Sequence, residues 1–259
     1  MDSFDLIVGV HSISKALKNS DREIFQVFYT EEGRKDLLKR SNLKEEDLKK
    51  HKCEQLDSHK LQEKAKDYYK SLKLDFQRVP SGVFILTSEI ETFDNNWLYD
   101  EVACRDDLKI LCLDQITDVH NGAAILRTAS FYGVDIVIIP GKKSFGFTPS
   151  FYRIASGATE SLRIVQTSNL SKVISTLSSR GITCIGLTEH VDSPLTAEVL
   201  REARLGLCLV LGKEETGISY AVLRNIKHQL ALIPAGDTRS LNVSVAAAIS
   251  MEKCFSVNS

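Results

Sequence analysis

The segment from Ile233 to Ser250 carries the residues in this chain that are best suited to chemistry. An apolar run ends at Pro234 and a polar loop follows. Ser240 would then cap a helix, because its hydroxyl oxygen accepts hydrogen bonds from free amides of the first turn. Small residues at helical spacing would let a ligand or another backbone approach closely: Val243, Ala246, Ala247 and Ser250. The same pattern fits an ordinary strand–loop–helix junction, so this segment alone leaves both interpretations open.

Two further segments also set polar residues among small or apolar ones. Residues 114–133 read DQITDVHNGAAILRTASFYG, and residues 209–218 read LVLGKEETGI. With residues 233–250, in this order and at these separations, they resemble the signature motifs of the SpoU/TrmH family of RNA ribose 2′-O-methyltransferases. Residues 155–160 (ASGATE) resemble the subgroup that methylates a guanosine ribose in large-subunit ribosomal RNA. The resemblance covers roughly residues 108–255.

This resemblance implies a cofactor and a set of site residues. The cofactor is S-adenosyl-L-methionine, held mainly by backbone groups, and the implied contacts are Thr188, Gly212, Ile233 and Leu241. The implied catalytic residues are Asn121, Arg127, Glu214, Ser240 and Asn242. In the family the arginine acts on the ribose hydroxyl as a base or as a polarising group. Because the pKa of arginine exceeds ~12, we expect Arg127 to orient substrate and phosphate instead.

The residue types alone also allow simpler interpretations. Gly212 fits a plain turn at the end of a strand, and Glu214 fits an acid that is favoured in the first turn of a helix. Arg127 fits a surface side chain that reaches past its apolar neighbours into water. The six histidines and six cysteines show no metal-ligand spacing, so no metal site is expected.

The absence of common nucleotide-binding motifs narrows the enzyme class. The chain contains neither G-x-G-x-x-G nor a Walker A motif, which disfavours dehydrogenases, P-loop enzymes and Rossmann-like methyltransferases. Unusual loops instead follow three apolar runs, at 187–189, 212–217 and 234–239. Ligands of open α/β sheets bind outside the carboxyl ends of the strands, so these loops are expected to converge on one crevice.

Beyond residue 107 the chain alternates apolar runs with amphipathic segments. The expected strands are Leu108–Leu113, Asp135–Ile139, Leu162–Val165, Thr183–Leu187, Leu207–Leu211 and Gln229–Ile233. The expected helices between them include Ala123–Tyr132, Leu170–Arg180 and Pro194–Arg204. Strands without polar alternation are typical of parallel sheets that are buried on both faces, so the pattern predicts an α/β domain. The family resemblance adds a trefoil knot in this domain.

The first 90 residues predict a smaller α/β domain. Strands are expected at Leu6–Val10, Ile24–Tyr29 and Gly82–Thr87, with lysine-rich helices between them. Residues 8–13 and 80–84 resemble the auxiliary domain of the same family, which is similar to a ribosomal-protein RNA-binding fold and selects the RNA. The predicted organisation is therefore an RNA-binding domain at 1–90, an acidic linker at 91–106 and a catalytic domain at 107–259.

Composition sets the broad class of the protein. The chain has 259 residues, of which 43% are hydrophobic and 26% charged, with a formal net charge of −1. No apolar run approaches the ~20 residues of a membrane span, and the sequence starts acidic without a signal pattern, so we expect a cytoplasmic protein. Residues 34–73 hold a local excess of Lys and Arg that could bind phosphate despite the overall charge.

We therefore expect S-adenosylmethionine-dependent 2′-O-methylation of structured RNA, with a ribosomal RNA guanosine favoured and transfer RNA open. One alternative is a non-catalytic RNA-binding or assembly protein on the same scaffold, suggested by a short loop after Pro234 and by departures from the family pattern at Val119, Ala123, Lys213 and Glu215. A small-molecule α/β enzyme is a third class. A homodimer is also expected, from apolar residues in 146–160 and 240–254: Phe147, Phe151, Ala155, Val245, Ala248 and Ile249.

Overall fold

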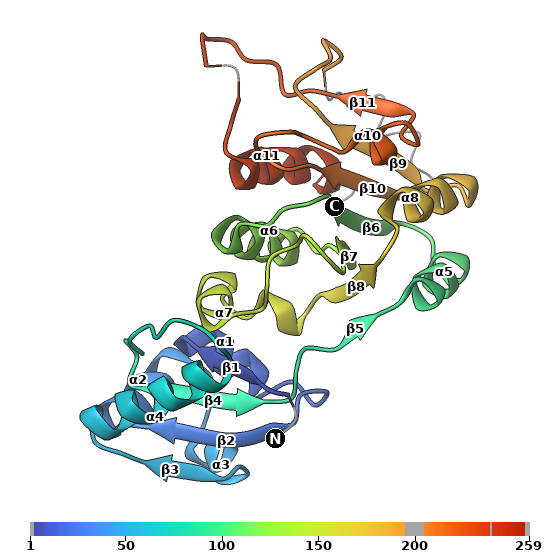
Figure 1. Ribbon diagram of the computed structural model, residues 1–259. Helices are drawn as coiled ribbons and strands as arrows, with labels where there is room; N and C mark the ends of the chain where they lie inside the picture. The colour runs from blue at the N-terminus through green and yellow to red at the C-terminus, as the bar shows by residue number, and fades with distance from the viewer. Residues whose placement is uncertain (1–2, 195–204, 239, 257–259) are drawn as a thin grey trace. The chain divides into compact units, whose positions relative to one another are not determined.

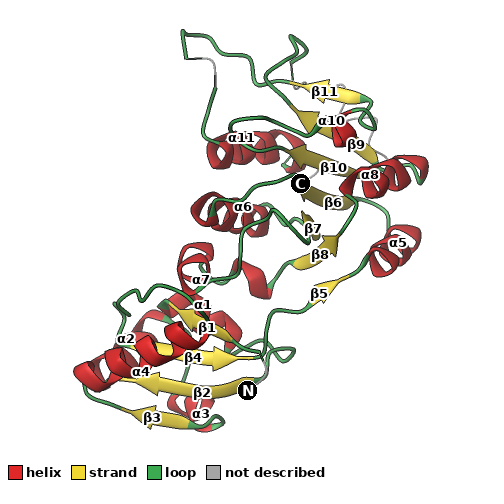
Figure 2. Ribbon diagram, in the orientation of Figure 1, coloured by secondary structure: helices red, strands yellow, loops and turns green. Residues whose placement is uncertain are grey.

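The computed structural model of the chain describes residues 3–194, 205–238 and 240–256 (Figures 1 and 2). It divides into two compact units. Unit 1 consists of Met1–Ile90 and Phe147–Glu160, and unit 2 consists of Glu91–Gly146 and Ser161–Ser259. A segment from the second half of the sequence therefore belongs to the first unit, whereas the predicted first domain ended at residue 90.

Unit 1 is built on a mixed four-stranded sheet with the order β1-β4-β2-β3. Its strands are β1 (Asp5–Val8), β2 (Ile24–Tyr29), β3 (Cys53–Gln55) and β4 (Val83–Thr87). Strand β4 pairs antiparallel with both β1 and β2, and β3 joins β2 in parallel. The helices of the first 90 residues are α1 (Val10–Ala16), α2 (Glu31–Arg40), α3 (Glu45–Lys49) and α4 (Ser58–Ser71).

One face of this sheet packs against α4. The rings of Phe28 and Phe84 stack at 4.7 Å between their centroids, and Leu61 and Ala65 of α4 are buried in the same cluster. The helix begins after Asp57, whose carboxylate accepts a hydrogen bond from the amide of Lys60. Alternating apolar residues on the strands thus meet an apolar stripe on the helix, which is the arrangement that a half-buried sheet requires.

The inserted segment of unit 1 contains α7 (Pro149–Ala155) and the short 3₁₀ helix η1 (Ala158–Glu160), and α7 packs against β1 and α1. A buried polar network ties it down. The Tyr152 hydroxyl donates to Asp5 at 2.5 Å, and Arg22 forms ion pairs with both Asp5 (3.1 Å) and Glu160 (3.5 Å). Burial raises the pKa of Asp5, although the bonds from Tyr152 and Arg22 act in the opposite direction.

Replacing Arg22 by methionine is expected to lower the free energy of unfolding by about 3–5 kcal/mol, because two buried carboxylates would lose their cation. Urea unfolding of the purified protein would measure the change. The matched control is Arg40→Met, which breaks an exposed ion pair with Asp36 and should cost less than about 1 kcal/mol. Equal effects of the two substitutions would contradict the assigned role of Arg22.

Unit 2 contains a seven-stranded sheet with the order β11-β9-β10-β6-β7-β8-β5, in which every described neighbouring pair is parallel. The strands are β5 (Thr92–Phe93), β6 (Leu108–Leu113), β7 (Ile136–Pro140), β8 (Arg163–Thr167), β9 (Thr183–Leu187), β10 (Gly206–Leu211) and β11 (His228–Leu230). The predicted α/β fold, with a small first unit and a parallel sheet in the second, is confirmed. The trefoil knot stays a prediction.

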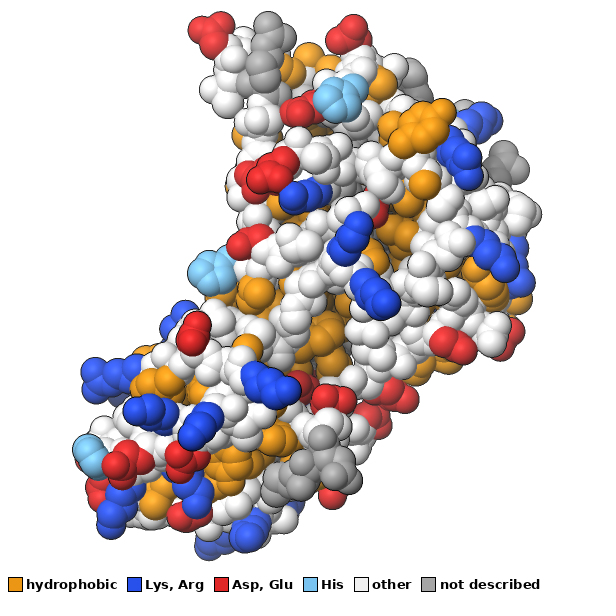
Figure 3. Space-filling model, in the orientation of Figure 1, with side chains coloured by type: hydrophobic (Ala, Val, Ile, Leu, Met, Phe, Trp, Pro, Cys, Tyr) orange, Lys and Arg blue, Asp and Glu red, His pale blue; other side chains and the backbone are white. Residues whose placement is uncertain are grey.

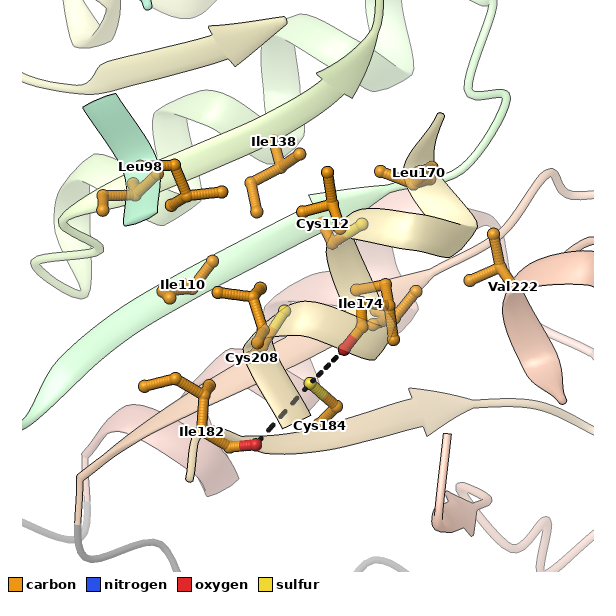
Figure 4. Packing of buried hydrophobic residues seen from close by; sticks show 14 of the residues in the cluster. Leu98, Ile110, Cys112, Ile138, Leu170, Ile174, Ile182, Cys184, Cys208 and Val222 are labelled. Atoms are coloured by element: carbon orange, nitrogen blue, oxygen red, sulfur yellow. Dashed lines mark hydrogen bonds between the residues drawn. The ribbon is translucent and has the colours of Figure 1, made fainter. Parts of the chain in front are cut away.

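Helices cover both faces of this sheet. On one face α6 (Val119–Phe131) packs beside α11 (Val243–Phe255), and the other face carries α5 (Asn95–Cys104), α8 (Leu170–Ser179) and α10 (Tyr220–Leu223) (Figure 1). The core beneath α5 and α8 includes three free cysteines on adjacent strands, Cys112, Cys184 and Cys208 (Figure 4). Burial keeps the pKa of the Cys112 thiol well above its ordinary value, so this thiol packs as a small apolar side chain.

Three local expectations differ from the structure. Residues 91–106, predicted to be a linker, contain β5 and α5, because Leu98 is fully buried and the Phe93 and Trp97 rings stack at 4.1 Å. Strand β11 ends at Leu230 rather than at residue 233. The helix predicted to start after Ser240 begins after Asn242. The helix predicted at 194–204 falls, beyond its first residue, outside the described residues.

In the part of the chain that the structure describes, no helix has both the length and the apolar character that crossing a membrane requires.

Candidate active site

A pocket of about 620 Å³ lies at the carboxyl ends of β9, β10 and β11. Its walls come from the loops that follow these strands, at 187–190, 211–217 and 231–238, and from one side of α11. The strands are parallel neighbours, so their carboxyl ends share one edge of the sheet and their loops meet there. This volume falls within the ~300–1,000 Å³ that is typical of small-molecule sites.

The four residues assigned to the cofactor all line this pocket: Thr188, Gly212, Ile233 and Leu241. Thr188 is buried and fixed by its neighbours, since its amide donates to the Leu230 carbonyl at 2.9 Å and its hydroxyl accepts from the His190 amide at 3.3 Å. Ile233 and Leu241 are instead exposed, with 56% and 46% of their surfaces accessible. Apolar side chains are thus available to a ligand in the pocket.

Gly212 is required by the backbone of its own loop. A Cβ at this position would lie 2.1 Å from the carbonyl carbon of Gly217 and from the amide nitrogen of Ile218. Reciprocal hydrogen bonds between Lys213 and Gly217, of 3.1 and 2.7 Å, close the turn over the glycine. A glycine permits close approach of backbone, and the backbone that approaches Gly212 is the returning end of the same loop.

Polar side chains from three distant segments meet beside the pocket. The Asn121 amide group donates to the Glu214 carboxylate at 3.4 Å, and the Asn242 amide group donates to the Asn121 carbonyl oxygen at 3.1 Å. Glu214 and Ser240 line the pocket itself. Four of the five residues predicted as catalytic therefore lie together: Asn121, Glu214, Ser240 and Asn242.

Helix capping explains how two of these side chains are held. The side chain of Asp118 caps α6, because its carboxylate accepts a hydrogen bond from the backbone amide of Asn121 at 2.7 Å. Asn242 caps α11 and accepts from both the amide and the hydroxyl of Ser244. Each asparagine thus sits at the first turn of a helix, where local hydrogen bonds restrict its position.

Arg127 lies apart from this group. It stands on α6 and is exposed, and its side chain forms no hydrogen bond or ion pair with the described residues. It lies six positions after Asn121, so the two side chains point to different sides of the helix. The structure therefore leaves the Arg127 guanidinium available to a ligand outside the pocket.

Some residues around the pocket were missed by the sequence analysis. Ile249 and Lys253 extend its lining along α11. They follow Val243 and Ala246 at intervals of three or four residues, and this helical spacing could have predicted that they share one face. Asp114 is buried at the end of β6 and accepts a hydrogen bond from the Ser219 amide at 2.7 Å, which anchors the end of the 212–218 loop.

The departure from the family pattern at two positions has a local explanation. Lys213 and Glu215, on either side of Glu214, form an ion pair of 2.6 Å across the turn. The hydrogen bond from Lys213 lowers the pKa of Glu215. Because Lys213 and Glu215 pair with each other, the Glu214 carboxylate stays available to the hydrogen bond from Asn121.

Comparison with a family model decides the relationship. Residues 109–252, more than half of the chain, match the model of the SpoU rRNA Methylase family. This chain belongs to the SpoU rRNA methylase family. The matched region contains all three segments that meet at the pocket.

Relatives and solved structures agree with this membership. The chain is 27% identical over 255 residues to an uncharacterized tRNA/rRNA methyltransferase of Synechocystis, covering 98% of this chain and 63% of that protein. It is 34% identical over 186 residues to a Staphylococcus aureus protein assigned to the TrmH family of tRNA/rRNA methyltransferases, covering 71% of this chain and 74% of that protein. The chain thus spans less than two thirds of the length of the Synechocystis relative.

The fold also matches that of solved SpoU proteins. The SpoU methyltransferase AviRb from Streptomyces viridochromogenes, crystallised with AdoMet, superposes with a TM-score of 0.70 at 20% sequence identity. The match covers 97% of this SpoU-family chain and 89% of AviRb. It extends over both units, so the arrangement of elements in each unit is that of a known SpoU fold.

Proposed function

We propose that this SpoU-family protein transfers a methyl group from S-adenosylmethionine to a ribose 2′-hydroxyl of structured RNA. The observation that carries the proposal is the meeting of Asn121, Glu214 and Asn242 beside a pocket at the strand ends. Along the chain, Asn121 is 93 residues from Glu214 and 121 residues from Asn242. The pocket lining has the mixed character that a nucleoside with an amino-acid tail requires.

The residues of this chain have distinct tasks in the proposed reaction. S-adenosylmethionine, when bound, supplies a methyl group on a positively charged sulfur. Thr188, Gly212, Ile233 and Leu241 would hold it, and Glu214 and Ser240 would shape the polar end of the pocket. Positioning of the ribose and removal of its hydroxyl proton are the remaining requirements, and neither calls for a metal or a covalent intermediate.

Asn121 and Asn242 are suited to orienting the ribose. Their amide groups are already linked at 3.1 Å, and both belong to helix amino ends where backbone amides favour negative charge. Such preorganised donors stabilise an oxygen that becomes more negative in the transition state. Arg127 would hold the RNA phosphate or the hydroxyl oxygen from outside the pocket.

We further propose a ribosomal RNA substrate, with transfer RNA as the alternative that the test must separate. The family description and the presence of a separate α/β unit with exposed lysines support this choice. The resemblance of residues 155–160 to the guanosine-modifying subgroup supports it less, because Gly157 and Glu160 have structural tasks inside unit 1.

We also propose a homodimer in which each site takes residues from both subunits. Val245 and Ile249 of α11 and Phe131 of α6 are exposed on adjacent helices, with 47%, 37% and 82% of their surfaces accessible. Two residues first expected on this surface do not belong to it, since Phe151 and Ala155 are buried inside unit 1. The dimer would place Arg127 of one subunit near the pocket of the other.

Incubation of the purified chain with radiolabelled S-adenosylmethionine and RNA from cells that lack the protein tests the function. The expected product is a 2′-O-methylated nucleotide, recognised because it resists alkaline cleavage, and mapping it separates ribosomal from transfer RNA. Cofactor binding by calorimetry without any transfer would favour the non-catalytic alternative. A chain that bound no S-adenosylmethionine would contradict the proposal altogether.

A further inference from the structure

Unit 1 has a cationic face that the sequence did not reveal. His11, Lys15 and Lys18 from α1 and the residues after it, and Arg153 from α7, are all exposed, and we call these four residues the α1/α7 face. The chain around them is free of acids, since residues 6–20 and 136–159 contain neither Asp nor Glu. Two segments about 140 residues apart therefore combine into one positive surface.

Close packing fixes the position of this face. The Ser12 hydroxyl donates to the Tyr152 carbonyl at 2.5 Å, which joins α1 to α7. A Cβ at Gly9 would lie 3.5 Å from the Cγ of Arg153, and one at Gly157 would lie 2.6 Å from the Cγ of Lys15. The stems of both cationic side chains therefore rest against glycine backbone, which sets where their charged ends enter solvent.

The acids beside this face are already engaged. The carboxylate of Asp47 in α3 interacts with the charge of Lys18 and forms an ion pair with Lys50 at 3.0 Å. Asp5 and Glu160 are occupied by Arg22, and Glu160 also accepts a hydrogen bond from Asn19 at 2.8 Å. Their side chains are less than 10% exposed. Among the described residues, none of the four members of the α1/α7 face forms an ion pair.

The basic stretch at 34–73 is different, because local acids pair with five of its thirteen Lys and Arg side chains and lie among the others. Five of its cations form ion pairs with carboxylates of the same helix or of a neighbouring one: Arg34, Lys35, Arg40, Lys50 and Lys60. A sixth, Lys64, lies 5.6 Å from the centre of the Phe28 ring. In Figure 3 basic and acidic side chains alternate over the visible part of unit 1.

We propose that the α1/α7 face is where unit 1 binds the phosphate backbone of RNA, and that Lys15 and Arg153 make its main contacts. This inference rests on the proposed RNA substrate and names the surface that receives it. Unpaired cations release counterions when they meet phosphates, whereas cations held by neighbouring carboxylates offer much less. Because α7 comes from the second half of the chain, both halves of the sequence encode the surface.

The test compares two double substitutions with the same change of charge. Lys15→Glu with Arg153→Glu alters the face. Lys66→Glu with Lys70→Glu alters two exposed lysines of α4, each of which has an acid three residues before it on the same helix, Glu63 or Asp67. The probe is a fluorescent ribosomal RNA hairpin, titrated with each full-length protein from 50 to 300 mM salt. The first variant should bind about tenfold or more weakly, with a salt slope smaller by about 1–2, and the control should stay near wild type.

Lys15→Gln with Arg153→Gln guards against misfolding, because glutamine keeps the stems that pack on Gly9 and Gly157. This glutamine variant should show the same decrease in the salt dependence of RNA binding, and its melting temperature should equal that of the wild type. Equal binding and slope for the face variants and the control would overturn this inference while methyl transfer by the wild type still upheld the proposed function. A wild-type chain that bound no RNA would overturn both.

Discussion

Replacing Arg127 by alanine should lower the rate of methyl transfer by about 10²–10⁴-fold, the range for losing one group that stabilises charge or assists proton transfer. The affinity for S-adenosylmethionine should stay within about twofold, because Arg127 lies outside the pocket that holds the four cofactor residues. Single-turnover transfer to RNA and calorimetry with the cofactor would measure the two quantities separately.

The matched control is Arg224→Ala, which removes another exposed arginine of unit 2 that lies outside the pocket. It should leave both quantities unchanged. Arg127→Lys keeps the charge but loses the planar guanidinium, so it should recover only part of the rate. Wild-type turnover in Arg127→Ala would remove Arg127 from the catalytic set, and a parallel loss of cofactor affinity would place it in the pocket instead.

Gly212→Ala should weaken S-adenosylmethionine binding and lower the rate of methyl transfer by about 10²-fold, the loss of rate that a misplacement of roughly 1 Å can cause. The added methyl group would meet the backbone of Gly217 and Ile218 at 2.1 Å, so the 213–217 turn that walls the pocket must move. Calorimetry with the cofactor measures the loss directly, and methyl transfer should fall with it.

Gly141→Ala is the control for this substitution. A Cβ at Gly141 would meet only the Thr167 carbonyl oxygen, at an ordinary 3.8 Å, and Gly141 lies outside the pocket. Its cofactor affinity should equal that of the wild type. If Gly212→Ala bound the cofactor as tightly as Gly141→Ala, the turn over Gly212 would not be a wall of the cofactor site.

The two inactive variants together examine the proposed shared site. In a mixed dimer, the Arg127→Ala subunit keeps an intact pocket and the Gly212→Ala subunit keeps its arginine. If arginine and pocket come from different subunits, mixing restores one complete site, and activity should approach a quarter of the wild-type value. No recovery on mixing, or light scattering that shows a single species near the 28.9 kDa of one chain, would contradict the shared site.

Strands of unit 2 could be predicted from the sequence because of how a parallel sheet is buried. A parallel sheet that is covered on both faces needs continuous apolar runs, and β6 and β9 have the predicted limits. The motif residues could be recognised as candidate site residues because polar side chains such as Asn121 and Asn242 stand among small and apolar ones. Their hydrogen bond at 3.1 Å confirms that these segments meet, although the role of each residue stays a proposal.

Other features depended on contacts that no local pattern encodes. The apolar residues Phe151 and Ala155 were interpreted as a dimer surface, yet they are buried inside unit 1. A chain shortened to residues 106–259 would therefore lose the partner of α7 and expose Tyr152, so removal of the first unit is expected to destabilise what remains. The start of α11 was misplaced for a similar reason, since both Ser240 and Asn242 can cap a helix and the path of the preceding loop selects between them.

The sequence by itself determined the fold class, the family and the residues that gather at the strand ends, because these follow from apolar periodicity and from short motifs with fixed order. Only the tertiary structure decided what surrounds each residue: the turn that forces glycine at position 212, the Arg22 network that holds α7, and the joining of Lys15 and Arg153 on one face. Burial and charge pairing depend on residues far apart along the chain, so they become visible only when the chain is folded.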